Sequence, residues 1–122
     1  MKYYSTNKQA PLASLEEAVV KGLAGDKGLY MPEHIRPLDK DTISGLKNKS
    51  FHEIACTAAQ AFFGEDIEPE TLDAIVRDTL SFETPVVPVR DNIYSLELFH
   101  GPTLAFKDVR GTFHGPPVRL FH

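Results

Sequence analysis

Residues 97–108 read Glu-Leu-Phe-His-Gly-Pro-Thr-Leu-Ala-Phe-Lys-Asp and carry the strongest functional signal in the chain. Gly101-Pro102 predicts a turn, and Thr103 predicts the start of a helix whose first turn carries Lys107. Three apolar residues precede this lysine. An amine forms a Schiff base only in its neutral form, and an apolar wall favours that form by lowering the pKa. Lys107 is therefore a candidate nucleophile, although most lysines in helices are solvated surface residues.

Two extended segments lead into this stretch. Residues 86–89 and 93–98 are rich in β-branched and aromatic residues, and Arg90-Asp-Asn92 between them predicts a tight turn. Residues 2–6 predict another short strand, and residues 28–32 a buried extended segment that proline closes.

Three helices are expected upstream. Ser14-Leu-Glu-Glu17 and Ser50-Phe-His-Glu53 fit the capping box, and Glu68-Pro-Glu-Thr71 places proline and acids at a helix start. The first helix should end before Gly25 and the second at Gly64. Their expected apolar faces are Leu15, Ala18, Val19 and Leu23 in the first, Phe51, Ile54, Ala55, Ala58, Ala59 and Phe62 in the second, and Leu72, Ile75, Val76 and Leu80 in the third.

Composition sets limits on the class of protein. No apolar run is long enough to span a bilayer, the N-terminus lacks a signal-peptide pattern, and a net charge of −4 argues against a nucleic-acid partner. Cys56 is the single cysteine, so we expect a soluble protein of the reducing cytoplasm. The element order predicts a mixed α/β fold with helices around a small sheet.

Other polar residues are expected to be structural. The five histidines show no metal spacing, and His52 is expected to be solvated beside its capping box. Cys56 is expected to be a small core residue, and the acids of residues 65–70 a solvated helix entry.

Residues 97–108 closely resemble the cofactor-lysine segment of threonine synthases, which are pyridoxal-phosphate enzymes. Tyr3-Tyr-Ser-Thr6, Ser14–Ala18, Gly28–Pro32 and Thr84–Pro88 resemble the N-terminal region of the same family. The resemblance covers residues 1 to about 109.

The resemblance implies a function and a site. Lys107 matches the lysine that holds pyridoxal 5'-phosphate as a Schiff base, and Phe106 is expected to pack near the pyridine ring. Residues 100–103 match the loop that shapes the site. The implied reaction is that of a carbon-oxygen lyase acting on a phosphate ester: O-phospho-L-homoserine and water give L-threonine and phosphate. The freed lysine is then available to carry protons.

The resemblance also implies a domain organisation. We expect a small mixed helix-sheet domain at residues 1–90 and the start of a fold-type II pyridoxal-phosphate domain at 91–109. Residues 110–122 depart from the family, and their codons permit a family-like helix in another reading frame, which predicts a frame slip near Val109. A cradle of backbone amides for the cofactor phosphate is expected beyond this truncated chain, which alone should be inactive.

Two alternatives remain open. One is a related pyridoxal-phosphate lyase of the serine or threonine dehydratase type. The other is a non-catalytic folded fragment that self-associates into a homo-oligomer through exposed apolar surface.

Overall fold

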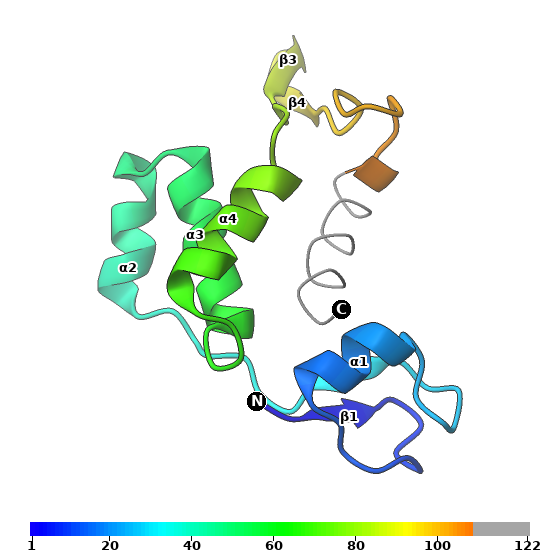
Figure 1. Ribbon diagram of the computed structural model, residues 1–122. Helices are drawn as coiled ribbons and strands as arrows, with labels where there is room; N and C mark the ends of the chain where they lie inside the picture. The colour runs from blue at the N-terminus through cyan, green and yellow to red at the C-terminus, as the bar shows by residue number, and fades with distance from the viewer. Residues whose placement is uncertain (109–122) are drawn as a thin grey trace.

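The computed structural model describes residues 1–108, which form helices and two separate two-stranded sheets (Figure 1). The helices are α1 (Leu15–Lys21), α2 (Lys40–Gly45), α3 (Phe51–Phe63) and α4 (Pro69–Thr79), with a 3₁₀ turn η1 (Leu46–Asn48). The strands are β1 (Tyr3–Ser5), β2 (Tyr30–Pro32), β3 (Val86–Arg90) and β4 (Ile93–Leu96). The expected mixture of helices and strands is confirmed, but the prediction of a single small sheet is wrong.

Both capping boxes form as predicted. The Ser14 hydroxyl accepts from the Glu17 amide while the Glu17 carboxylate accepts from the Ser14 amide, and Ser50 and Glu53 do the same for α3. These local bonds satisfy amides that have no partner inside the helix, which explains why α1 and α3 begin where they do. Gly64 caps α3, and Pro69 occupies the first turn of α4, both as expected.

The first sheet joins distant parts of the N-terminal segment. β1 and β2 pair antiparallel, with Tyr3 opposite Pro32, and Tyr3 also exchanges two backbone hydrogen bonds with Ala13. The prediction that residues 28–32 are extended is confirmed. The prediction that they are buried is wrong, because Met31 is 43% exposed and Leu29 is also exposed.

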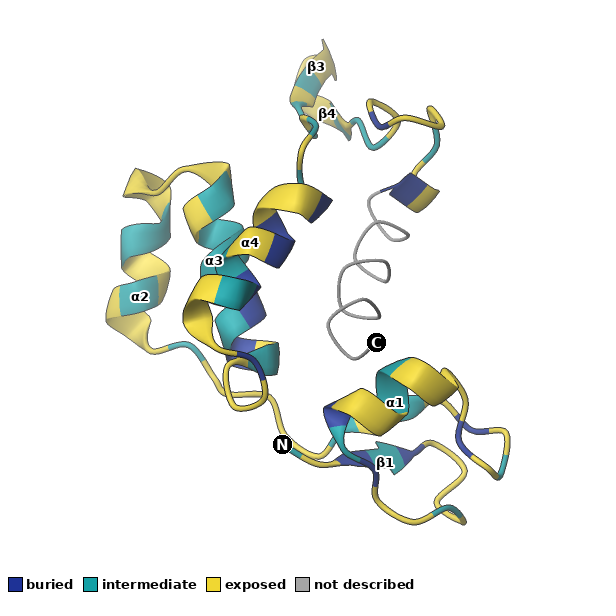
Figure 2. Cartoon of the chain, viewed as in Figure 1, coloured by how far each residue is buried: buried dark blue, intermediate teal, exposed yellow. Residues whose placement is uncertain are grey.

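One apolar core cluster joins the N-terminal segment to the later helices. Figure 2 marks buried stretches of β1, α1, α3 and α4 in dark blue. The cluster joins β1 and α1 to the antiparallel pair α3 and α4 through Tyr3, Leu15, Ala59, Ile67, Leu72, Ile75 and Val76. Leu72 is 1% exposed, as the predicted apolar face of α4 requires. The amino group of Met1 adds an ion pair to Asp66 at 2.9 Å.

Several expected core positions are corrected. Leu23 lies beyond the end of α1, which Gly22 caps, and it forms a β-bridge with Leu29 while remaining exposed. On α3, Phe51, Ala58 and Phe62 are exposed, whereas Ala59 is buried as predicted and Ala61, which was not predicted, is buried as well. The helix α2 was not predicted, and its N-cap Asp39 accepts from the Thr42 amide.

The second sheet is a hairpin. β3 and β4 pair antiparallel, and Asp91-Asn92 form the two-residue turn with Asp91 at φ +43°, so the tight-turn prediction is confirmed. Leading from α4, the hairpin stands apart from the helices in Figure 1. The expected boundary at residue 90 falls inside this hairpin and stays a prediction.

No helix in the described part of the chain is long and apolar enough to cross a membrane. The predicted frame slip and atypical tail, residues 110–122, lie outside the described residues.

Candidate functional site

The loop that precedes Lys107 is held closed by Asp108. The Thr103 amide and hydroxyl both donate to the Asp108 carboxylate, at 2.7 and 2.6 Å. The Asp108 amide donates to the carbonyl of Ala105, and the Leu104 amide to that of Gly101. The hydrogen bonds from Thr103 are the main reason that the pKa of Asp108 lies below its ordinary value, so the carboxylate stays ionised at neutral pH.

Gly101 makes this closure possible. A Cβ atom at this position would lie 2.5 Å from the Asp108 Cβ and 2.7 Å from its Oδ2, closer than real atoms approach. Both Gly101 and Asp108 are buried. Only glycine fits against the carboxylate, so this residue has a steric role in the loop.

The start of the loop is also structured. His100 Nε2 lies 2.6 Å from Glu97 Oε2, and its ring stacks on Phe99 with the centroids 4.8 Å apart. The partner of His100 is thus the carboxylate of Glu97, at the end of the hairpin. The expectation that residues 100–103 shape the site stays a prediction.

Two expectations about the lysine segment are corrected. Helical structure begins at Lys107 and not at Thr103, because residues 103–106 form turns in which Leu104 takes a φ of +54°. Lys107 is exposed, and so are Leu104 and Phe106, the latter at 66%. Within residues 1–108 no apolar wall surrounds the lysine. The site role of Lys107 and Phe106 stays a prediction.

A separate apolar groove of about 370 Å³ lies between the N-terminal sheet and the helices. Its lining includes Tyr3, Val19, Tyr30, Phe62 and Phe63. Neither Lys107 nor Phe106 borders it, and its side chains offer little acid-base chemistry. The groove is therefore not the site of the lysine chemistry.

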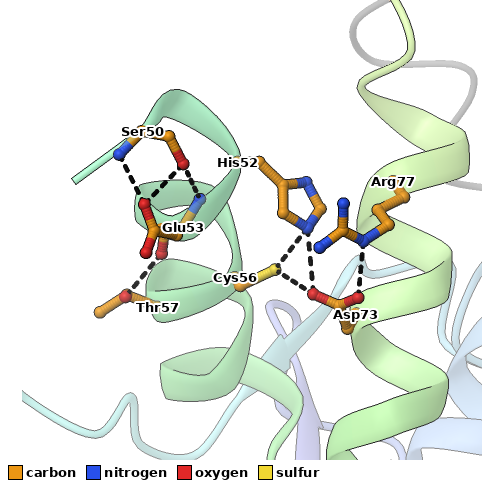
Figure 3. A network of polar contacts seen from close by, with 7 residues as sticks. All are labelled: Ser50, His52, Glu53, Cys56, Thr57, Asp73 and Arg77. Carbon is orange, nitrogen blue, oxygen red and sulfur yellow. Dashed lines mark hydrogen bonds and ion pairs between the residues drawn. The ribbon is translucent and has the colours of Figure 1, made fainter.

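A polar cluster between α3 and α4 was missed from the sequence (Figure 3). His52 Nε2 lies 3.0 Å from Asp73 Oδ1, and the Cys56 thiol donates to the same oxygen at 3.2 Å. Arg77 Nε donates to the other oxygen, Oδ2, at 2.8 Å. His52 is therefore not simply solvated, and the spacing of His52 and Cys56, four residues apart on one helix, was the signal that could have found it.

The charges of this cluster follow from its contacts. Arg77, then His52 and Cys56, hold the pKa of the Asp73 carboxyl well below its usual range. Burial, followed by the hydrogen bond to Asp73, raises the pKa of the Cys56 thiol to about 11. At neutral pH the cluster holds a carboxylate and a protonated thiol. Cys56 packs against the apolar core as expected of a small core residue, but it is only half-buried and also bonds Asp73.

Comparisons with known proteins identify the class. Residues 2–80 match the sequence model of a protein family described as "Threonine synthase N terminus". Threonine synthase of Haemophilus influenzae is 38% identical over 113 residues, covering 93% of this chain and 26% of that protein.

Solved structures agree. The structure of "PLP bound Threonine synthase from Brucella melitensis" matches with a TM-score of 0.91 and 36% identity, over 99% of this chain and 27% of that one. Threonine synthase from Escherichia coli matches with a TM-score of 0.92 and 33% identity, over 99% and 28%. The class is a mixed helix-and-strand domain of the kind found at the N-terminus of larger synthases. The chain belongs to the threonine synthase N-terminus family, and it spans about a quarter of the length of the relatives it matches.

Proposed function

We propose that this chain forms the N-terminal part of a threonine synthase, a pyridoxal-phosphate-dependent lyase that converts O-phospho-L-homoserine and water to L-threonine and phosphate. The observation that carries the proposal is the family match over residues 2–80, joined to a TM-score of 0.91 with a relative whose structure is described as bound to pyridoxal phosphate. As part of the same proposal, residues 91–109 begin the cofactor domain and the protein works in the cytoplasm.

The described residues fit part of a pyridoxal-phosphate site. The Lys107 amine is exposed, so a carbonyl carbon can reach it, and the backbone just before it is fixed by the contacts between Thr103 and Asp108. The exposed Phe106 ring is available to pack on a flat heteroaromatic group. Residues 1–108 contain no glycine-rich loop that opens a helix, so we assign the phosphate cradle to residues beyond 108.

Each residue then has a defined task. Lys107 Nζ would hold the cofactor, and the same amine would accept and return a proton at the substrate carbon. Phe106 orients the ring, while Asp108 and Gly101 hold the loop that positions the lysine. When bound, the cofactor supplies the electron sink for elimination of phosphate. We also propose that the 122-residue chain alone is inactive, since residues 1–108 lack the cradle and residues 110–122 depart from the family pattern.

A chimera tests the function. Residues 1–108 would replace the matching segment of the Escherichia coli threonine synthase, and release of phosphate and formation of threonine from O-phosphohomoserine would be measured. We expect activity in the chimera, none after Lys107→Ala, and unchanged activity after Lys47→Ala, a matched exposed lysine on η1. Equal activity of the Lys107→Ala chimera would refute the role of the lysine.

The same chimera tests the alternative that the chain belongs to a related lyase of the serine or threonine dehydratase type. A serine or threonine dehydratase forms a keto acid and ammonia from the free amino acid, without phosphate release. A chimera that acts on serine or threonine and leaves O-phosphohomoserine unchanged would favour that reading.

One observation favours the second candidate, a self-associating fragment. Large apolar side chains are exposed on the hairpin and on α3, namely Val86, Val89, Ile93, Tyr94, Leu96, Phe51 and Phe62. Such surface promotes association of free chains. Two measurements on the 122-residue chain separate the two candidates: sedimentation, and borohydride reduction with pyridoxal phosphate followed by peptide mass analysis. A mass tag on Lys107 supports a lysine site. A defined oligomer without the tag supports the self-associating fragment.

A further inference from the structure

We infer that His52, Cys56 and Asp73 form a three-ligand site for a divalent transition metal, with Zn²⁺ as the fitting ion, between helices α3 and α4. This site is distinct from the lysine loop and does not depend on the proposed catalytic function. Each residue offers one ligand atom, and the three atoms all lie within 4.8 Å of one another. Figure 3 shows the side chains pointing toward one another across the two helices.

The ligand triangle already has nearly the right size. Its edges are 3.3 Å from Cys56 Sγ to His52 Nε2, 3.2 Å from Sγ to Asp73 Oδ1, and 3.0 Å from Nε2 to Oδ1. A tetrahedral zinc with bonds of about 2.0–2.3 Å holds its ligand atoms roughly 3.3–3.5 Å apart. The triangle therefore needs to open by only a few tenths of an ångström, which small side-chain rotations supply.

The helices hold the triangle in place. His52 and Cys56 are four residues apart on α3, so their side chains share one face, and α4 presents Asp73 to that face. Capping at both ends of α3, by Ser50 and by Gly64, fixes the helix that carries two of the three ligands. The site is thus built on regular structure and not on a loop.

The ligand chemistry selects the ion. One thiolate, one imidazole and one carboxylate match the donors that Zn²⁺ takes in proteins, whereas Ca²⁺ and Mg²⁺ require several oxygens. On binding, a bond forms from the metal to sulfur and the thiol proton passes to solvent, with no change of oxidation state. All three residues are partly exposed, so an ion can enter and a water molecule can complete the coordination.

Arg77 is compatible with the ion. It bonds Asp73 Oδ2 and leaves Oδ1 for the metal, the arrangement in which an outer partner orients a ligating carboxylate. Its side chain is 66% exposed, so the guanidinium can move into solvent when a cation binds.

Cobalt binding to the tag-free 122-residue chain tests the site. Co²⁺ alone is titrated and the sulfur-to-cobalt charge-transfer band is recorded, followed by displacement with Zn²⁺. Since Cys56 is the only cysteine, this band reports that residue alone. We expect the band in the wild-type chain, its loss in Cys56→Ser, and at least about tenfold weaker cobalt binding in His52→Gln and Asp73→Asn.

The matched control is His34→Gln. His34 also faces a carboxylate, Glu65, at 3.1 Å, but its exposed pair has no thiol beside it. This variant should keep the band and the affinity. Zinc should raise the thermal midpoint of the wild-type and His34→Gln chains and not that of Cys56→Ser, because an ion that binds only the folded chain stabilises it.

Loss of the cobalt band in a variant counts only when that variant is folded. Helical circular dichroism is recorded for every variant, and only folded variants are compared. A folded wild-type chain that shows no sulfur-to-cobalt band, or a band that survives in His52→Gln and Asp73→Asn at full affinity, would show that these residues do not form a metal site.

Discussion

The Asp108 carboxylate accepts hydrogen bonds from both the amide and the hydroxyl of Thr103, five residues earlier, at 2.7 and 2.6 Å. One side chain thereby closes the turn that ends at Lys107. A residue in the middle of the loop, Gly101, packs directly against the same carboxylate. The position of the lysine backbone is consequently set by its neighbour in sequence.

Replacing Asp108 by Ala should open this turn. The Thr103 amide loses a charged acceptor, and we expect its hydrogen exchange to become about tenfold faster or more. Amide exchange read by NMR or mass spectrometry measures the effect. Exchange in the core of α4 should stay unchanged, and slow exchange at Thr103 in the variant would show that another contact closes the turn.

Gly28→Ala should destabilise the N-terminal sheet. A Cβ atom there would meet the Ser5 hydroxyl and lie 2.9 Å from the backbone nitrogen of Asn7. Backbone cannot move aside without disturbing β1, so we expect a loss of about 1–3 kcal/mol in the free energy of unfolding.

Gly25→Ala is the control for that variant, since nothing lies within 4 Å of its added Cβ and its φ is not positive. Thermal or urea unfolding of both variants gives the comparison. Equal stability of the two chains would contradict the steric account of Gly28.

Leu72→Ala should be the most damaging single truncation in the described core. The side chain is 1% exposed and belongs to the apolar core cluster, so its removal should cost about 2–5 kcal/mol. Urea unfolding at equilibrium measures the loss. Leu29→Ala, at an exposed position, should cost far less, and a similar loss in both would argue against this core.

Asp26 should make the N-terminal segment sensitive to acid. The Ser5 hydroxyl donates to it at 2.6 Å, and the amides of Gln9, Ala10 and Gly28 donate as well, so its pKa lies below the usual 3.8. A carboxyl with a depressed folded-state pKa stabilises the fold above its unfolded-state value, and this contribution disappears as the pH falls through the folded-state pKa.

The matched comparison is Asp26→Asn. We expect the variant to have a lower thermal midpoint at pH 7, because its amide nitrogen faces donors, and the difference from wild type to shrink below about pH 3.8. Midpoints measured across pH 2–7 check the sign. A constant difference over that range would mean that ionisation of Asp26 contributes nothing.

Local features were predictable from the sequence, and long-range ones were not. The two capping boxes, the Pro69 helix start and the Asp91-Asn92 turn depend on residues within four positions, and all form as predicted. Side-chain burial depends on what packs against a face. For this reason Phe51 and Phe62 looked like core on α3 and are exposed in the described part of the chain.

The candidate sites show the same division. Lys107 was found through resemblance, yet its exposure depends on neighbours that sequence spacing cannot specify. The contact between His52 and Asp73 joins residues 21 positions apart, and only the packing of α3 on α4 brings them together. The sequence shows His52 and Cys56 four residues apart on one helix, but it does not show that Asp73 lies beside them.

The hairpin of β3 and β4 has a consequence for the order of events during synthesis. Among residues 1–108, every buried member of the apolar core cluster lies before residue 77. During synthesis, the segment that forms this core therefore leaves the ribosome before Val86 does. The hairpin is synthesised later and, within residues 1–108, has exposed apolar side chains and unpaired strand edges, which are features that favour association with another chain.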